Sequence, residues 1–417
     1  MTNPLSPLSI DMDDFCFFDT ETRALPGLEN PDWGNVKIAG LYRYAASTKV
    51  IILTYAIGLG PVKEWVLEDF DGTLRWADAP ADLAAFRERA VKRGDCWFVA
   101  WNAAFDREVC NRGMVSLTRA PAIPIEAIID ASPQAMASGL PGGLGQAAKV
   151  LGTTRKVELG KNLIGVFTPA DGATPQQRPE QWEEFRHYAR EDVEAMRDIF
   201  LSTRQLTRRD WEEYWAAEHV NARGVPVDRA YVERAAALAA VYAAQSAAEV
   251  RRITGQQWGP KHHVALANWT YDKLAPTQPD LCEMMVTSYE EGDSEEDWVV
   301  GKVSLDRRRI EQIIGALEAL DEAQGLTDDE LAALELCEVK LYGAGSTVMK
   351  FDRMLPMIDP DGNLRGQYVF NGAAQTGRFS SKGVQLHNLT RQWVGMEEKD
   401  PTLEEQALIF ISDLEPG

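Results

Sequence analysis

The stretch FFDTET (residues 17–22) places two carboxylates, Asp19 and Glu21, at the end of the apolar run FCFF. A short apolar run of this kind is typical of a buried strand. The acids are compatible with a strand that ends in a solvated turn, which is the ordinary context of a D-x-E triplet. They are also compatible with half of a metal site, and that interpretation requires further ligands elsewhere in the chain.

Length and composition limit the classes of protein to which this chain can belong. Its 417 residues leave room for about two or three domains, and 45% of them are hydrophobic. No stretch approaches the roughly 20 apolar residues of a membrane span, and the N-terminus lacks the basic and apolar regions of a signal peptide. Five scattered cysteines with no C-x-x-C pair favour reduced thiols over disulfides or a zinc site. We therefore expect a cytoplasmic protein that binds no membrane.

The net charge of −21 argues against a protein that coats nucleic acid without specificity. It does not exclude an enzyme with a local basic track, because phosphate contacts depend on where Lys and Arg lie. Much of the acid lies in residues 283–297, which are expected to form an exposed loop or insertion.

The two halves of the chain differ in pattern. Strands are expected in the first half at FCFF, IAGLYRYAAS, VIILTYAIG, VKEWVL and CWFVAW. Helical spacing appears between and after them, most clearly over residues 179–205, and this mixture predicts an α/β layer fold. The second half is mostly helical, over 207–223, 228–254, 305–320 and 328–356. We predict an α/β domain at residues 11–205 and a mostly helical region at residues 206–417.

Two further patterns could complete the site that FFDTET begins. NAAFD (residues 102–106) follows the strand-like CWFVAW and opens a helix. In HYAREDV, Tyr188 and Asp192 are four residues apart and so share one helix face. Each pattern has a plainer interpretation, since an Asn can cap a helix above a core Phe and a Y-x-x-x-D pair can lie on a surface. Their combination and order are much harder to attribute to chance.

Taken together, the three patterns resemble the motifs of the DnaQ-like (DEDD) 3′–5′ exonucleases, in the branch joined to family A DNA polymerases. FFDTET resembles the first motif, NAAFD the second and YAREDV the third, and LPGGLGQAAKVLG with KVELGKNLIGVF is similar to the segment before the third motif in phage members. The resemblance covers roughly residues 13–205. It implies a ribonuclease H-like fold, a mixed sheet with flanking helices, and a proofreading exonuclease of phage-type DNA replication in the host cytoplasm.

The resemblance also assigns roles to residues. Two Mg²⁺ ions about 4 Å apart can activate a water and stabilise the departing 3′ oxygen, and Mn²⁺ is expected to substitute for them. Hard oxygen ligands suit Mg²⁺. Tyr188 is implied to orient the attacking water, and Thr20, Asn102 and Phe105 are implied to contact the DNA strand. The implied metal ligands are Asp19, Glu21, Asp106 and Asp192.

One assignment has a competitor on the same helix. His187 lies five residues before Asp192, which is the spacing of the histidine branch of the superfamily, in which the His acts as general base. Tyr188 lies four before, which is the tyrosine spacing. Adjacent helical residues are about 100° apart, so both cannot point inward. The order Y-A-x-E-D favours Tyr188.

The second half resembles the polymerase part of family A enzymes. Residues 207–227 are similar to its entry, and WGPKHHVALANWT (258–270) is similar to a thumb segment. The longest likeness is NGAAQTGRFSSKGVQLHNLTR (371–391), which looks like the T-G-R segment beside the primer–template. His387 and Thr390 depart from that pattern, which weakens individual contact assignments. The residues suited to DNA contacts are Arg378, Gln385, Asn388 and Arg391.

The nucleotide-addition motifs of family A polymerases do not occur in the sequence. There is no D-[YF]-S-x-x-E, no R-x-x-x-K-x-x-x-[FY]-x-Y-G helix and no later H-D-E. We therefore expect a chain that cuts DNA at single-stranded 3′ ends or a primer–template but does not extend it alone. A separate partner polypeptide is expected to carry the palm and fingers. The alternative is a non-catalytic DNA-binding or assembly subunit that clamps primer–template for a separate polymerase chain.

Overall fold

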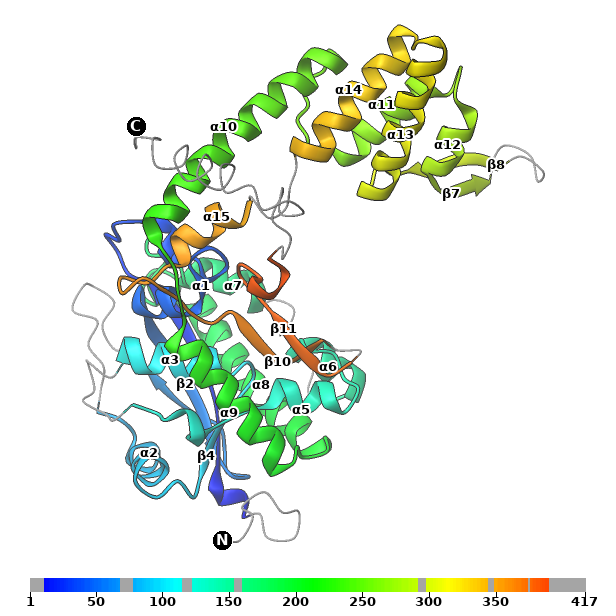
Figure 1. The fold of residues 1–417 in the computed structure, drawn as a ribbon. Coiled ribbons are helices and arrows are strands. Elements are labelled where there is room, and N and C mark those ends of the chain that lie inside the picture. The colour runs from blue at the N-terminus through cyan, green and yellow to red at the C-terminus, as the bar shows by residue number, and fades with distance from the viewer. Residues whose placement is uncertain are drawn as a thin grey trace. The chain divides into compact units, whose positions relative to one another are not determined.

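The computed structural model describes residues 11–67, 78–114, 122–153, 160–291, 298–343, 349–373 and 376–389. The chain divides into two compact units (Figure 1). The first unit comprises Met1–Arg229 and Arg353–Leu389, and the second comprises Ala230–Asp352 and Thr390–Gly417. All five cysteines are free and buried, as their spacing predicted.

A five-stranded mixed sheet forms the centre of the first unit. Its strands are β1 (Phe15–Ala24), β2 (Thr48–Ile57), β3 (Lys63–Val66), β4 (Trp97–Ala100) and β5 (Ile128–Asp130). The strand order is β3-β2-β1-β4-β5. Strand β1 is parallel to β4, which is parallel to β5, whereas β1, β2 and β3 pair antiparallel. The predicted α/β class with a mixed sheet and flanking helices is confirmed.

Helices cover both faces of this sheet, as Figure 1 shows. They are α1 (Val36–Ala46), α2 (Ala81–Arg93), α3 (Ala104–Val109), α5 (Ala131–Ala137), α6 (Leu144–Leu151), α7 (Gly160–Phe167), α8 (Pro179–Ser202) and α9 (Arg208–Arg223). On one face, the ring of Phe17 meets that of Phe200 from α8 at 5.4 Å. On the other face, Phe18 meets Phe98, which in turn meets Phe86 from α2. Successive residues of β1 thus pack on opposite faces.

The strand expected at IAGLYRYAAS is wrong, because this stretch lies in helix α1. The buried residues Leu41, Tyr44 and Ala45 recur at helical spacing, which is indistinguishable from a strand pattern over so few residues. Gly40 has a φ of 71° and kinks the helix. Any other residue at this position would place its Cβ 2.7 Å from the side chain of Met357.

The boundary expected near residue 205 does not coincide with the division between the units. Helix α9 belongs to the first unit because Trp211 is fully buried in its core and Tyr214 is almost so. The indole Nε1 of Trp215 donates to the carbonyl oxygen of Ile128 on β5 at 2.8 Å. The first unit also includes two strand pairs from later in the chain: β6 (Val225–Pro226) with β9 (Asn363–Leu364), and β10 (Tyr368–Ala373) with β11 (Arg378–Ser381).

The second unit is mostly helical, as the sequence predicted for this part of the chain. Its helices are α10 (Arg229–Thr254), α11 (His263–Leu274), α12 (Pro279–Met285), α13 (Arg307–Gln324), α14 (Asp328–Gly343) and α15 (Met349–Met354). The loop expected from residue 283 is wrong over the described residues 283–291, which lie at the end of α12 and in β7 (Val286–Glu291), because β7 is supported by pairing with β8 (Trp298–Val303). None of the described helices combines the length and the apolar character that crossing a membrane requires.

Candidate active site: carboxylates beside strand β1

The sequence indicated a strand that ends before the acids. In the structure, strand β1 instead continues through them. It pairs with β4 only from Phe15 to Phe17, whereas its ladder with β2 extends to Ala24. Asp19 and Glu21 therefore lie past the end of the β1–β4 ladder and, being two residues apart, on one face of the strand. This arrangement leaves the space beyond the end of β4 for other segments of the chain.

The turn after β4 brings Asp106 into this space. Asp106 lies in the first turn of α3 and is 2% exposed. Its Oδ1 accepts hydrogen bonds from the backbone N–H of Thr20 at 3.0 Å and from the Thr20 hydroxyl at 2.6 Å. The second motif is thereby joined to the first by Thr20, the residue between the two acids of β1.

Helix α8 brings the third motif to the same face of β1. Phe200 packs on Phe17, and Asp192 precedes Phe200 by eight residues, or about 12 Å of helix. Glu21 follows Phe17 by four residues, or about 13 Å of strand. A helix that runs antiparallel to the strand therefore carries Asp192 to the level of Glu21. Tyr188 lies one turn farther along and is 5% exposed.

Electrostatic interactions show that the three motifs share one site. Burial raises the pKa of Tyr188, and so do the nearby charges of Asp192, Glu21 and, more weakly, Asp19. Burial also raises the pKa of Asp106 well above its ordinary value, with the charge of Asp19 as the next cause, although the hydrogen bonds from Thr20 oppose the shift. Asp19 thus acts on both the second and the third motif.

The competition between His187 and Tyr188 is decided by their faces of α8. The His187 side chain is 58% exposed, and its Nε2 lies 3.3 Å from Glu191 Oε1. Tyr188, about 100° around the helix from His187, is buried near the carboxylates. The geometry favours the tyrosine spacing that the sequence indicated.

The donor set fits a hard divalent cation. The four acids offer only carboxylate oxygens, and the pKa of Asp106 is raised first by burial and then by the charge of Asp19, a repulsion that a cation would relieve. Within the part of the chain that the structure describes, no three His, Cys, Asp or Glu side chains are already arranged to hold a metal ion. Mg²⁺ is usually held by one or two carboxylates together with waters and substrate phosphates, so the chemistry of these donors suits it.

The residues expected to contact DNA around this site differ in accessibility. Asn102 is exposed, in the turn after β4. Phe105 is half-buried, and its ring stacks on that of Tyr44 at 5.8 Å. Thr20 is buried, and its hydroxyl is engaged by Asp106. A DNA contact by Thr20 stays a prediction, and its observed role is to hold Asp106.

Three of the four later residues expected to contact DNA lie on the first unit. Arg378 is exposed on β11, and Gln385 and Asn388 are exposed just after it. Arg391 lies outside the described residues. Their contacts with DNA stay predictions, but the segment that carries them belongs with the α/β unit and not with the helical unit.

The hairpin β10–β11 is attached to the α/β unit by asparagine side chains. The amide of Asn221 on α9 donates to the carbonyl oxygen of Tyr368, and its Oδ1 accepts from the Tyr368 N–H, both at 2.9 Å. Asn371 Nδ2 donates to the carbonyl oxygen of Pro133 on α5 at 3.1 Å. The hairpin is therefore anchored to two helices of the unit that holds the carboxylates.

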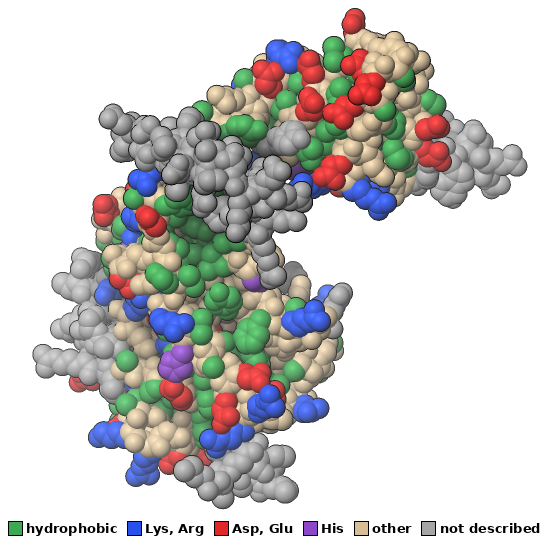
Figure 2. Space-filling model, viewed as in Figure 1, with side chains coloured by type: hydrophobic (Ala, Val, Ile, Leu, Met, Phe, Trp, Pro, Cys, Tyr) green, Lys and Arg blue, Asp and Glu red, His purple; other side chains and the backbone are tan. Residues whose placement is uncertain are grey.

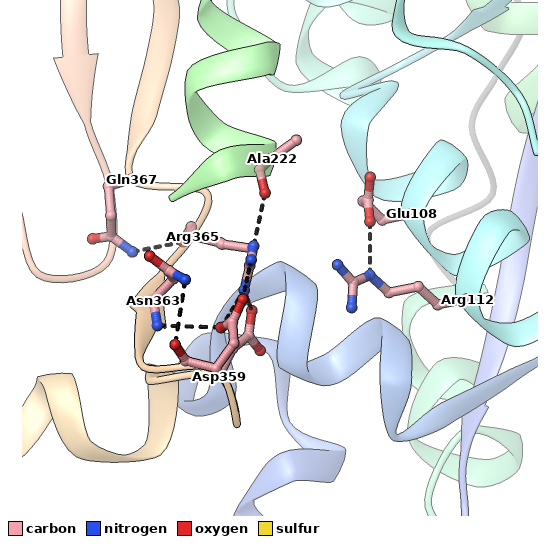
Figure 3. A network of polar contacts seen from close by, with 8 residues as sticks. Glu108, Arg112, Ala222, Asp359, Asn363, Arg365 and Gln367 are labelled. Atoms are coloured by element: carbon pink, nitrogen blue, oxygen red, sulfur yellow. Dashed lines mark hydrogen bonds and ion pairs between the residues drawn. The ribbon is translucent and has the colours of Figure 1, made fainter. Parts of the chain in front are cut away.

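A network of hydrogen bonds around one arginine joins the segment before the hairpin to the end of α9 (Figure 3). Arg365 Nε donates to the carbonyl oxygen of Ala222 at 2.7 Å, and its Nη1 bonds Asp359 at 2.6 Å and Asp361 at 2.8 Å. Hydrogen bonds from Arg365 lower the pKa of Asp361. The network is structural, since every acceptor in it is engaged by the chain itself.

The sequence analysis missed one buried carboxylate beside the site. Asp130 ends strand β5, and its Oδ1 accepts the N–H of Asn102 at 2.9 Å. Burial raises its pKa to about 7, although hydrogen bonds from the backbone at Ser132 and Asn102 oppose the shift. A signal was present, because Asp130 follows the apolar run AII as directly as Asp19 follows FCFF.

Comparisons with known proteins give one relative in sequence. No protein-family model matches the chain. A curated DNA polymerase from Bacillus phage SP02 is 27% identical over 366 residues, which cover 84% of this chain and 48% of that protein. The chain thus spans about half the length of the curated relative that it matches. Among solved structures, the POL domain of Pol1 from M. smegmatis, in complex with DNA primer–template and dNTP, matches with a TM-score of 0.41 and 13% identity, over 83% of this chain and 50% of that one.

Proposed function

We propose that this chain, which is similar to a phage DNA polymerase, is of the family A type and that its first unit is a metal-dependent 3′–5′ exonuclease that proofreads DNA during replication. The observation that carries the proposal is that three distant segments meet beside β1: Thr20 bonds Asp106 of α3, and the charges of Asp192, Glu21 and Asp19 reach the buried Tyr188 of α8. The strand order β3-β2-β1-β4-β5, with its antiparallel edge, supports a ribonuclease H-like arrangement.

The chemistry follows from the charges at the site. Hydrolysis of a phosphodiester brings an anionic nucleophile to an anionic phosphate, so positive charge must be concentrated there. Two Mg²⁺ ions, when bound, supply that charge and an activated water. The residues of this chain that would hold them are Asp19, Glu21, Asp106 and Asp192. Thr20 keeps Asp106 in place through two hydrogen bonds.

Tyr188 acts as an orienting group and not as a base. Its raised pKa keeps the hydroxyl protonated at neutral pH, so it can donate a hydrogen bond to the phosphate or hold the attacking water. Asn102, exposed in the turn after β4, is suited to the sugar or phosphate of the terminal nucleotide. Phe105, supported by Tyr44, offers an aromatic face for the terminal base.

A second part of the proposal concerns the polymerase. The hairpin β10–β11 carries exposed Arg378 and the 50% exposed ring of Phe379, which suit contacts with primer–template. The sequence contains none of the three nucleotide-addition motifs. We therefore assign nucleotide addition to palm and fingers supplied by further polypeptide. A primer-extension assay with this chain alone should give no product, and extension by it would overturn this part.

The nuclease is tested with a single-stranded oligonucleotide that carries its label at the 5′ end. The whole chain with Mg²⁺ should produce a ladder that shortens from the 3′ end, and EDTA should abolish it. Absence of the ladder in Mg²⁺ and in Mn²⁺, with tight binding of primer–template retained, would favour the non-catalytic clamp. His187→Ala is the control variant. His187 is exposed on the helical turn of the third motif, so this substitution should leave the rate near that of the wild type.

A further inference from the structure

We propose that Asp130 is a positioning residue of the nuclease site, whose carboxylate holds the backbone of Asn102 in the left-handed conformation from which helix α3 starts. The inference rests on the proposed nuclease function for its effect on activity, although its structural part stands without it. Asp130 belongs to none of the three motifs.

The sheet register explains how Asp130 reaches the turn. Strands β4 and β5 are parallel neighbours, and Ala100 is the partner of Asp130. The chain leaves the sheet directly after Ala100, so the turn at residues 101–103 lies beside the end of β5. Asp130 Oδ1 accepts the N–H of Asn102 at 2.9 Å and the N–H of Ser132 at 3.0 Å. One oxygen therefore joins the start of the α3 segment to the N-terminus of α5.

The conformation that Asp130 holds is one that needs support. Asn102 has a φ of 61°, and only three described residues other than glycine have a positive φ. This region is unfavourable for an L-residue, although less so for Asn than for most. The hydrogen bond from Asn102 to a buried carboxylate offsets that cost. Backbone strain that is held by its surroundings is a recurrent feature of functional sites.

Asn102 in turn sets the direction of α3. Its carbonyl oxygen accepts the N–H of Phe105 at 2.9 Å, and the carbonyl oxygen of Ala103 accepts that of Arg107 at 3.0 Å. These bonds form the first turn of the helix that carries Asp106. A change at Asn102 is therefore transmitted within one turn to a metal ligand and to the aromatic face of Phe105.

Asp130 has no route to the substrate itself. Asp130 is 6% exposed. Two buried groups of α9 interact with it: the charge of Glu218 raises the pKa of Asp130, and the charge of Asp130 raises the pKa of Tyr214. Its hydrogen-bonded partners are backbone N–H groups. It acts on the reaction through its hydrogen bond to Asn102 at the start of α3, and its charge also adds, more weakly than burial and the charge of Asp19, to the raised pKa of Asp106 on that helix.

The test combines three single variants and one double variant of the whole chain with two readouts. Asp130→Ala should lower kcat/KM on single-stranded DNA about 10- to 100-fold, as loss of a supporting residue typically does. Asp130→Asn keeps an oxygen acceptor and should retain most of the activity. Asn102→Gly adopts the positive φ without cost, so removal of Asp130 in that background should cost clearly less than it does in the wild type.

The second readout is hydrogen exchange of the peptide spanning residues 102–109, measured without metal or DNA. Asp130→Ala should speed exchange in this peptide, and Asp130→Asn should not. If the wild type cuts no DNA, the proposed nuclease fails while this readout still tests the positioning role. The inference is overturned if Asp130→Ala exchanges like the wild type in this peptide, or if Asp130→Asn loosens the whole first unit as much as Asp130→Ala does.

Discussion

The two units bury carboxylates in opposite ways. In the first unit, Asp106 and Asp130 have raised pKa values because burial and neighbouring charges outweigh their hydrogen bonds. In the second unit, Glu330 is 3% exposed, yet its pKa is lowered to about 2. The main cause is the hydrogen bond from the backbone N–H of Thr327 at 2.8 Å, followed by one from Gln278 Nε2 at 2.7 Å.

The difference separates a structural acid from acids that need a ligand. Glu330 forms the reciprocal hydrogen bonds of a capping box with Thr327, three residues before it, so its charge is stabilised by the fold. Asp106 instead has its pKa raised by burial and then by the charge of Asp19, and the proposed cations would relieve that repulsion. Sites that reduce stability in the absence of a ligand are typical of function.

The surfaces of the two units also differ in the view of Figure 2. On the visible face of the first unit, Lys and Arg side chains lie among acidic and hydrophobic ones, whereas acidic side chains are prominent on the visible face of the second. A face with interspersed basic residues is the better surface for a phosphate backbone. Three of the residues predicted to contact DNA, Arg378, Gln385 and Asn388, belong to the first unit.

The largest expected effect is that of removing charge from the site. Asp106→Asn keeps an oxygen for both hydrogen bonds from Thr20 but lowers metal affinity, so nuclease activity should fall on the order of 10³-fold. Because a buried charge is removed, unfolding in EDTA should require on the order of 1 kcal/mol more free energy. Activity is measured by single-turnover cleavage and stability by urea denaturation. If Asp106→Asn is inactive and also less stable than the wild type, the distinction between the two kinds of acid is contradicted.

The next effect concerns the hydroxyl of Tyr188. Tyr188→Phe keeps the buried ring and should lower the cleavage rate about 10- to 100-fold, because the nucleophile or phosphate loses an orienting contact. His187→Ala, from the exposed face of α8, should change the rate less than about twofold. Equal losses in the two variants would contradict the assignment of the tyrosine spacing.

The contributions of Asp130 and Glu330 to stability should depend on pH with opposite signs. Asp130 has a raised pKa, so between about pH 4 and 7 the folded state holds more protons than the unfolded one, and its contribution to stability falls as pH rises. Glu330 has a lowered pKa, so its contribution falls as pH drops from about 4.5 to 2. Each slope is at most about 1.4 kcal/mol per pH unit.

Two variants isolate these slopes. Asp130→Asn should flatten the dependence near neutral pH, and Glu330→Gln should flatten only the acid limb. Urea denaturation followed through hydrogen exchange of peptides from each unit attributes the change to its unit. The comparison is contradicted if Glu330→Gln changes the pH dependence of stability near neutral pH instead of at acid pH.

The smallest expected effect tests whether the hairpin belongs with the α/β unit. Asn221→Ala removes two hydrogen bonds to Tyr368, and unfolding should require about 1–3 kcal/mol less free energy, with faster proteolysis in β10–β11. Asn111→Ala is the matched control, since Asn111 makes the same pair of bonds to Ile123 elsewhere in the unit. It should lower stability similarly without exposing the hairpin. Equal proteolysis in both variants would contradict the anchoring.

Sequence reasoning could predict the candidate site because each motif is local. Asp19, Asp106 and Asp192 each follow or lie on an element whose pattern is readable over a few residues, and their order selects one arrangement. It missed the continuation of β1 through the acids, because the support for that stretch comes from β2, some 30 residues later. Strand pairing of this kind is not encoded in the local pattern.

The same limit explains the other differences. The boundary near residue 205 failed because Trp211 and Tyr214 are buried by packing against the sheet, which helical spacing alone does not reveal. The placement of Tyr368 beside Asn221 depends on hydrogen bonds between residues 147 positions apart. Asp130 was missed because its importance lies in a register partner, Ala100, on another strand.

The most direct test of the central claim is the single-turnover rate at which the whole chain shortens a 5′-labelled single strand in Mg²⁺, compared with that of Asp19→Ala. Asp19 is the acid whose charge reaches both Asp106 and Tyr188. The account predicts 3′-to-5′ shortening by the wild type and a loss on the order of 10³-fold in the variant. Shortening at the wild-type rate by Asp19→Ala, or none by the wild type, would contradict it.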